Sequence, residues 1–258
     1  MITQEFELAK KYLIKTEIGT NGISIAQLTI DNVARTEAMF QTDSSYKKTV
    51  DKNAKPIKYP KKQTDEFKYG GSTAYWMNQL KDVLIDNQPV SRDNYTFGEI
   101  IKYAVNAVDR ENSTHLNSDG VGREEITDRI ISLKSEILQL LSNPQENDYK
   151  IVKEISKKTT RAKKQRQNPS FASKFAHYAS FYLFEGTEKQ DNFSIYDGVL
   201  KEALPFYFSF YNIKDFDLSG DYYAYQKAID ELRDCAAKKY GETISRNGLD
   251  HLVWYYHK

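Results

Sequence analysis

The spacing of hydrophobic and polar residues changes along the chain and predicts a mainly helical protein with a minor strand element near the N-terminus. Residues 23–30 alternate between apolar and polar side chains, as a half-buried strand does, so a small strand pair is expected within residues 1–35. Residues 41–72 have little periodicity and end at Gly70 and Gly71, which indicates a long loop. Helical spacing takes over after these glycines.

Apolar residues at helical intervals predict most of the remaining elements. In one helix, for example, Ile126, Ile130 and Leu133 fall on a single face. The predicted helices cover residues 75–85, 95–108, 124–141, about 149–164, a segment carrying Phe171, Phe175, Tyr178 and Tyr182, and residues 199–211, 222–239 and 247–256.

Turn-forming residues predict where several of these helices begin and end. The Asn143-Pro144 pair ends the helix before it, and Gly241 is a plausible stop for the helix over residues 222–239. Asn168 is placed to cap the next helix, with Pro169 at its first position, where a missing backbone N–H costs nothing.

Composition is that of an ordinary globular protein. The 258 residues are 40% hydrophobic and 28% charged, which allows one domain or two. No apolar stretch is long enough to span a bilayer, and residues 1–7 lack the pattern of a secretory signal, so a cytoplasmic protein is expected. A single cysteine, Cys235, on the apolar side of a helical pattern predicts buried packing, and four scattered histidines suggest no metal centre.

The net charge of +1 does not by itself indicate a nucleic-acid partner, but basic residues are concentrated in one segment. Residues 150–166 hold eight of them against the single acidic Glu154. These are Lys150, Lys153, Lys157, Lys158, Arg161, Lys163, Lys164 and Arg166. A second basic stretch covers residues 47–68. A solvated helix face or a flexible linker is the alternative reading of both stretches.

Most motifs of catalysis and nucleotide binding are missing, including the P-loop, the dinucleotide-binding glycine pattern and the metalloprotease and hydrolase motifs. What remains is the run Asn168-Pro-Ser-Phe-Ala-Ser-Lys174, followed by Asp197 within Phe193-Ser-Ile-Tyr-Asp-Gly-Val199.

These motifs resemble those of the helix-hairpin-helix DNA glycosylases, and most closely the bacterial 8-oxoguanine-glycosylase-like proteins. Pro169 and Lys174 match the family hairpin directly, and Asp197 takes the place of its aspartate. Ser170 and Ala172 stand where the hairpin has glycines, with Phe171 between them, and the gap between lysine and aspartate is longer. Residues 246–254 resemble the arginine, leucine-aspartate and leucine-tryptophan ending of these proteins.

The resemblance covers about residues 150–258 and implies both a fold and a reaction. The implied fold has two helical lobes around a cleft, with an N-terminal lobe over residues 1–145 and a glycosylase-like lobe over residues 146–258. The implied reaction is excision of a damaged or modified base from duplex DNA by a monomer that needs no metal or cofactor. The base would be extruded from the helix, and strand cleavage by a lyase step could follow.

The resemblance also implies site residues. Lys174 would be the nucleophile, because aromatic neighbours and the start of a helix favour the neutral amine that attacks a sugar carbon. Asp197 would stabilise the positive charge on the sugar or activate the nucleophile. The implied DNA-binding residues are Lys163, Lys164, Arg166, Asn168, Ser170, Ala172 and Ser173, and the implied pocket residues are His177, Tyr196 and Trp254.

Plainer interpretations stay open for each of these residues. Lys174 would then be a surface lysine, Asp197 a helix cap and the aromatic residues core. At the level of function, the alternative is a DNA-binding protein that keeps the glycosylase scaffold without its chemistry, and an RNA-directed defence factor is a third option. Repair of oxidised guanine and excision of modified bases from phage DNA are both compatible with the motifs.

Overall fold

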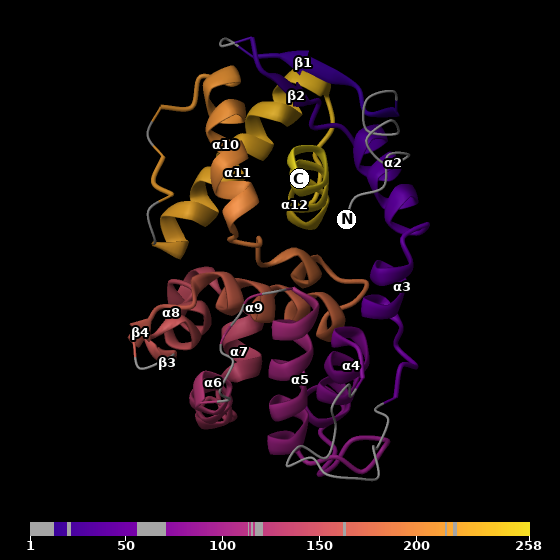
Figure 1. Ribbon diagram of the computed structural model, residues 1–258, viewed down its shortest axis with the longest axis vertical. Coiled ribbons are helices and arrows are strands. Elements are labelled where there is room, and N and C mark those ends of the chain that lie inside the picture. Colours follow the sequence, from indigo (N-terminus) through magenta and orange to yellow (C-terminus); the bar gives the residue numbers. More distant parts are fainter. Residues whose placement is uncertain are drawn as a thin grey trace. The chain divides into compact units, whose positions relative to one another are not determined.

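A computed structural model describes residues 13–19, 22–55, 71–112, 114, 116, 121–161, 164–214, 216–218 and 221–258. The protein is mainly helical, with a small antiparallel pair of strands near the N-terminus, as the sequence predicts (Figure 1). Within the described residues, no helix combines the length and the apolar character needed to cross a membrane.

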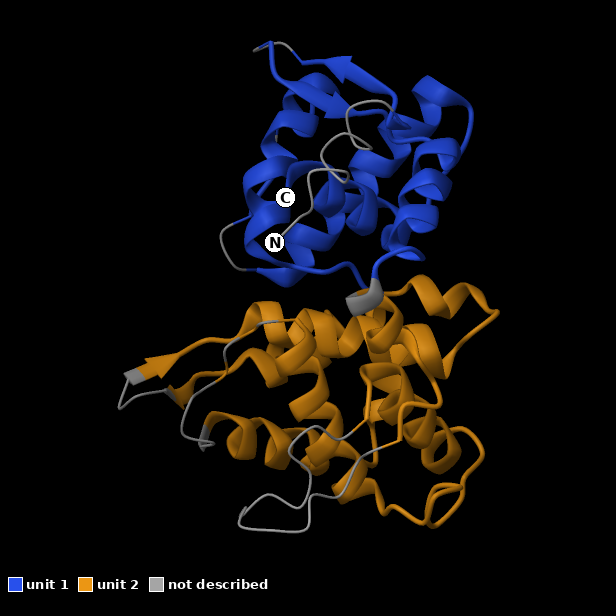
Figure 2. Cartoon of the chain, turned by 45° about the vertical axis from the view of Figure 1, so that its right-hand side comes forward, with its two compact units in different colours: residues 1–43, 193–258 blue, residues 44–192 orange. Residues whose placement is uncertain are grey.

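The chain divides into two compact units, which are coloured separately in Figure 2. Unit 1 combines Met1–Asp43 with Phe193–Lys258, and unit 2 is Ser44–Asn192. This division differs from the predicted one at residue 145, because the N-terminal elements pack on the C-terminal helices. The backbone N–H of Ala26, for example, donates to the hydroxyl of Tyr207 at 3.1 Å.

The described residues of unit 1 form a strand pair and four helices. Its described elements are β1 (Thr16–Ile18), β2 (Ser24–Ala26), α2 (Ile30–Phe40), α10 (Gly198–Phe210), α11 (Tyr222–Tyr240) and α12 (Arg246–His257). β1 and β2 are antiparallel, with Thr16 opposite Ala26. The predicted strand is confirmed but shorter, because the side chain of Thr29 accepts from the N–H of Asn32 and thereby starts α2.

Helix α12 forms the centre of unit 1 and packs against both α2 and α10 (Figure 1). Leu249, Leu252 and Val253 of this helix are fully buried. The predicted helices over residues 199–211, 222–239 and 247–256 are confirmed, and Gly241 ends α11 with a φ of 75°, in the left-handed region. Cys235 of α11, expected to be buried, is only half-buried.

Unit 2 is built around α9, which contacts α4, α5, α7 and α8. Its described elements are α3 (Ser44–Val50), α4 (Thr73–Leu84), α5 (Phe97–Glu111), α6 (Val121–Ser132), α7 (Ile137–Ser142), η1 (Gln145–Asn147), α8 (Lys150–Ser156), β3 (Thr159–Arg161), β4 (Lys164–Arg166), α9 (Pro169–Leu183) and η2 (Glu188–Asp191). Eleven of the fifteen residues of α9 are buried, so this helix forms much of the core.

Three sequence predictions in unit 2 are corrected. The helix expected over residues 124–141 is two helices, α6 and α7, joined by a turn. The expected loop over residues 41–72 contains helix α3. The helix expected over residues 149–164 ends at Ser156 and is followed by the β3–β4 pair.

The β3–β4 pair replaces a helix for two physical reasons. The β-branched Thr159 and Thr160 favour extended backbone. In a continued helix, Lys157 would also lie one turn from Arg161, and like charges at that spacing destabilise a helix.

Candidate functional site

The run from Asn168 to Lys174 forms the start of α9, with Pro169 at the first helical position as predicted. Asn168 precedes the helix, but its side chain does not cap it. Its amide nitrogen Nδ2 instead donates to Thr159 Oγ1 at 2.8 Å and to the carbonyl oxygen of Arg166 at 3.2 Å. Asn168 therefore ties the base of the β3–β4 pair to the beginning of α9.

Lys174 lies in the second turn of α9, as its sixth residue, rather than in the first turn. Its side chain is 8% exposed, and it is the only buried lysine among those whose side chains the structure describes. Phe171 and Phe175, on the same helix, stack with ring centroids 6.2 Å apart. The structure thus places Lys174 in a buried, aromatic-rich part of α9, and the surface-lysine reading is wrong.

The other predicted residues at the start of α9 differ in exposure. Ser170 is half-buried, whereas Ala172 and Ser173 are fully buried. The Ala172 N–H donates to the Asn168 carbonyl, and the Ser173 hydroxyl donates to the Ser170 carbonyl. Because these groups face the interior and bond within the helix, we leave Ala172 and Ser173 out of the candidate DNA-binding surface.

Residues 157–166 contain the antiparallel β3–β4 pair, and we call this segment the basic arm. Its sequence holds six basic residues and no acidic one. Thr159 pairs with Arg166, and Arg161 pairs with Lys164. Lys158 and Arg166 are exposed, whereas Lys163 lies outside the described residues. Lys150 and Lys153 of the predicted basic cluster therefore lie on helix α8, as expected, whereas its other members follow Ser156, where the helix has ended.

The basic arm is fastened to α6 through neutral groups of its own. The guanidinium of Arg129 donates to the carbonyl oxygens of Lys157 and Lys158, at 2.6 Å each. The carboxylate of Glu125 accepts from the N–H and from the hydroxyl of Thr160, at 2.9 Å each. The hydrogen bonds from α6 are thus made to the arm's backbone and to its threonine.

Asp197 lies in unit 1, where it is the N-cap of α10. Its Oδ1 accepts from the N–H of Leu200 at 3.0 Å, and the side chain is 7% exposed. This confirms the capping role that the sequence left open. A cap of this kind also holds the carboxylate at a fixed position relative to the helix.

The extended segment before Asp197 is held by side chains from α11 and α12. Asp250 Oδ2 accepts from the N–H of Ile195 at 2.6 Å, and the hydroxyl of Tyr225 donates to the carbonyl of the same residue at 2.6 Å. The hydroxyl of Tyr222 donates to the carbonyl of Ser194, also at 2.6 Å. Because the backbone groups of Ser194 and Ile195 are buried and hydrogen-bonded, the segment holds Asp197 in a fixed position.

The motif over residues 246–254 therefore has a structural task in unit 1. Arg246 pairs with Asp230 of α11 at 2.8 Å, while Asp250 holds the segment before Asp197. Sequence reasoning did not assign this task to Asp250. The available signal was a carboxylate next to Leu249 and close to Leu252, on the apolar side of a predicted helix, since such groups are buried only when they are bonded.

The three predicted pocket residues are divided between the units. His177, on α9 of unit 2, is buried and stacks on Phe181 with ring centroids 6.2 Å apart. Tyr196 of unit 1 is buried, and its hydroxyl donates to the carbonyl of Leu218 at 3.0 Å. Trp254 is half-buried, with Lys258 Nζ 3.9 Å from its ring centroid. No single unit contains all three residues.

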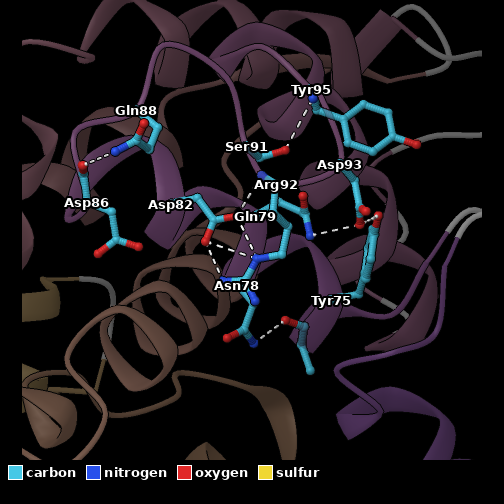
Figure 3. A network of polar contacts seen from close by, with 11 residues as sticks. Tyr75, Asn78, Gln79, Asp82, Asp86, Gln88, Ser91, Arg92, Asp93 and Tyr95 are labelled. Atoms are coloured by element: carbon cyan, nitrogen blue, oxygen red, sulfur yellow. Dashed lines mark hydrogen bonds and ion pairs between the residues drawn. The ribbon is translucent and has the colours of Figure 1, made fainter.

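A separate polar network joins α4 of unit 2 to the loop that precedes α5 (Figure 3). Asp82 accepts from the backbone N–H and the guanidinium of Arg92, and Asp93 accepts from the hydroxyl of Tyr75 at 2.7 Å. The nearby depression, of about 650 Å³, is lined by Asp82, Asp86, Gln88, Val90, Ser91, Arg92 and Asn94. Because Asp82 and Asp93 form hydrogen bonds that join α4 to the loop, we interpret the network as structural.

Electrostatics agree with that interpretation. Burial opposes ionisation of Asp82, but the hydrogen bonds from Arg92 outweigh it and hold the pKa of Asp82 below its ordinary value. The hydroxyl of Tyr75 likewise lowers the pKa of Asp93, and burial raises that of Tyr75. Both carboxylates are therefore held in their charged forms.

Comparison of the chain with protein-family models, with curated proteins and with solved structures found no match. Among the described residues, no group of three or more His, Cys, Asp or Glu side chains is placed to hold a metal ion.

Proposed function

We propose that the protein is a DNA glycosylase that excises a damaged or modified base from duplex DNA. The observation that carries the proposal is the burial of Lys174 on α9, at the position where the sequence resembles the nucleophile of the helix-hairpin-helix glycosylases. Lysines are rarely buried, and the resemblance gives the buried Lys174 the task of a nucleophile. A neutral amine is the form that attacks carbon.

In the proposed reaction, the Nζ of Lys174 bonds to C1′ of the deoxyribose while the bond from C1′ to the base breaks. The base leaves with the bonding electron pair and takes up a proton, and the amine gives up a proton. Opening of the sugar ring then yields a Schiff base, from which the 3′ phosphate can be eliminated. The proposal gives Asp197 the task of stabilising positive charge on the sugar. The reaction needs no metal or cofactor.

DNA binding in this proposal is sequence-independent and uses phosphate contacts. The exposed Lys158 and Arg166 of the basic arm supply positive charge, and Asn168 connects the arm to α9. Backbone phosphate contacts of this kind fix the position of a protein on DNA without reading its sequence. The protein is proposed to act as a monomer.

Borohydride trapping tests the proposed chemistry. The protein is incubated with duplexes that carry oxidised guanine or phage-type modified bases, and both covalent adducts and released bases are measured. We expect an adduct with at least one duplex and its loss in Lys174→Gln. Lys153→Gln, at an exposed lysine of α8, is the matched control and should trap like the parent protein. If no duplex in the panel yields an adduct or a free base, the enzyme proposal fails.

A second candidate is a DNA-binding protein without catalysis. It is favoured by the serine and alanine, Ser170 and Ala172, that replace the hairpin glycines, because glycine lets a backbone approach phosphate most closely. Under this alternative, Lys174→Gln binds DNA as the parent protein does, and neither protein releases a base.

A further inference from the structure

We propose that the basic arm is a phosphate-binding arm that contacts the backbone of a nucleic-acid duplex. This deepens the proposed function and relies on it for the choice of DNA as the duplex. The arm is anchored through uncharged groups of its own, it exposes Lys158 and Arg166, and its composition suits a phosphate backbone.

The anchors leave the arm's charge available to a partner. Glu125 is the acidic residue that reaches the arm from α6, and its carboxylate bonds to Thr160 instead of pairing with a lysine or arginine of the arm. Within the part of the chain that the structure describes, Lys157 pairs with Glu154, but neither Lys158 nor Arg166 forms an ion pair. The contacts with α6 therefore hold the arm in place without neutralising Lys158 or Arg166.

The composition of the arm points to a duplex backbone. Apart from Ala162 the arm has no apolar residue, so it offers nothing to insert into the apolar region of a membrane. It also lacks Phe, Tyr, Trp and His, the side chains on which the bases of single strands stack. Charge without stacking or insertion fits the phosphates of a duplex.

The test compares Lys158→Gln/Arg166→Gln with Lys48→Gln/Lys102→Gln, which removes the same charge from exposed lysines of α3 and α5. Fluorescence anisotropy measures binding of each full-length protein to a labelled, undamaged DNA duplex between about 50 and 200 mM salt. For the arm variant we expect the magnitude of the slope of log K against log salt concentration to decrease by about 1.8, and the affinity near 0.1 M salt to drop tenfold or more. The control variant should keep the parent slope.

The arm inference and the glycosylase proposal can fail separately. An arm variant with the parent slope and affinity overturns the inference, even when borohydride trapping succeeds. A reduced slope together with no trapping on any duplex supports the inference and overturns the glycosylase proposal. Loss of binding to anionic lipid vesicles with unchanged duplex binding also overturns the inference. Circular dichroism and thermal unfolding confirm that the variants fold, which is expected because neutral groups anchor the arm.

Discussion

Asp250 holds the segment that leads to Asp197, and its replacement tests how firmly unit 1 fixes that segment. In Asp250→Ala, the buried N–H of Ile195 loses an acceptor that lies at 2.6 Å. A hydrogen bond to a charged group contributes about 1.5–3 kcal/mol, and a buried donor without an acceptor costs about 1–3 kcal/mol. We expect the free energy of unfolding of unit 1 to fall by about 3 kcal/mol.

The two tryptophans allow each unit to be followed separately in urea. Trp254 lies in α12 of unit 1, and Trp76 lies in α4 of unit 2. In a Trp76→Phe background, fluorescence therefore reports unit 1, and Asp250→Ala should lower the midpoint by about 1.5 M if the m-value is about 2 kcal/mol/M. The fluorescence of Trp76, followed in a Trp254→Phe background, should not shift.

Asp250→Asn is the matched control, because its amide oxygen can still accept from the N–H of Ile195. We expect a smaller loss than in the alanine variant, about 1 kcal/mol, since the hydrogen bond becomes a neutral one. If both variants unfold at the urea concentration of the parent protein, the hydrogen bond from Ile195 to Asp250 does not stabilise the segment, and this bond does not fix the position of Asp197.

Two further predictions concern unit 2. The pKa of Asp82 in the folded protein lies below the ordinary 3.8, so its pairing with Arg92 stabilises the fold above pH 3.8, and this stabilisation is lost as the pH falls through the folded pKa. The fluorescence of Trp76, followed as the pH is lowered, should report this loss of stability. In Asp82→Asn, this part of the pH dependence should be absent. Arg129→Met removes both hydrogen bonds to the carbonyls of Lys157 and Lys158 and should weaken the arm's attachment by about 1–2 kcal/mol. Amide hydrogen exchange in β3 should then speed up, and unchanged exchange would show that the guanidinium is not an anchor.

Helices with strong apolar periodicity could be predicted from the sequence, whereas the basic arm could not. Ile126 and Ile130, for instance, mark the buried face of α6 correctly. For residues 157–166, charge was interpreted as a helix surface, although the two threonines and the like charges both oppose a helix. No feature of the sequence near residues 157–166 indicates that Arg129 and Glu125 of α6 form hydrogen bonds with the arm, because those contacts arise only in the folded unit.

The local structure of the candidate residues could be predicted in part. The sequence selects Lys174 and Asp197 by their resemblance to a motif, and the structure shows that both are buried and that Asp197 caps a helix. Asn168 was expected to cap α9, but its amide braces the arm, since a side chain bonds to the closest suitable group in three dimensions. The task of Asp250 was missed for the same reason, because its partner Ile195 lies 55 residues earlier in the chain.

The arrangement of unit 1 sets an order of events during synthesis. The N–H of Ala26 bonds to Tyr207, which is 181 residues later, and the N–H of Ile30 bonds to Glu242, which is 212 residues later. All of unit 2 is made between these partners, so it can fold on the ribosome while α2 still lacks α12. The face of α2 that is buried in the folded protein therefore stays open until α12 has been made, and only then can unit 1 close.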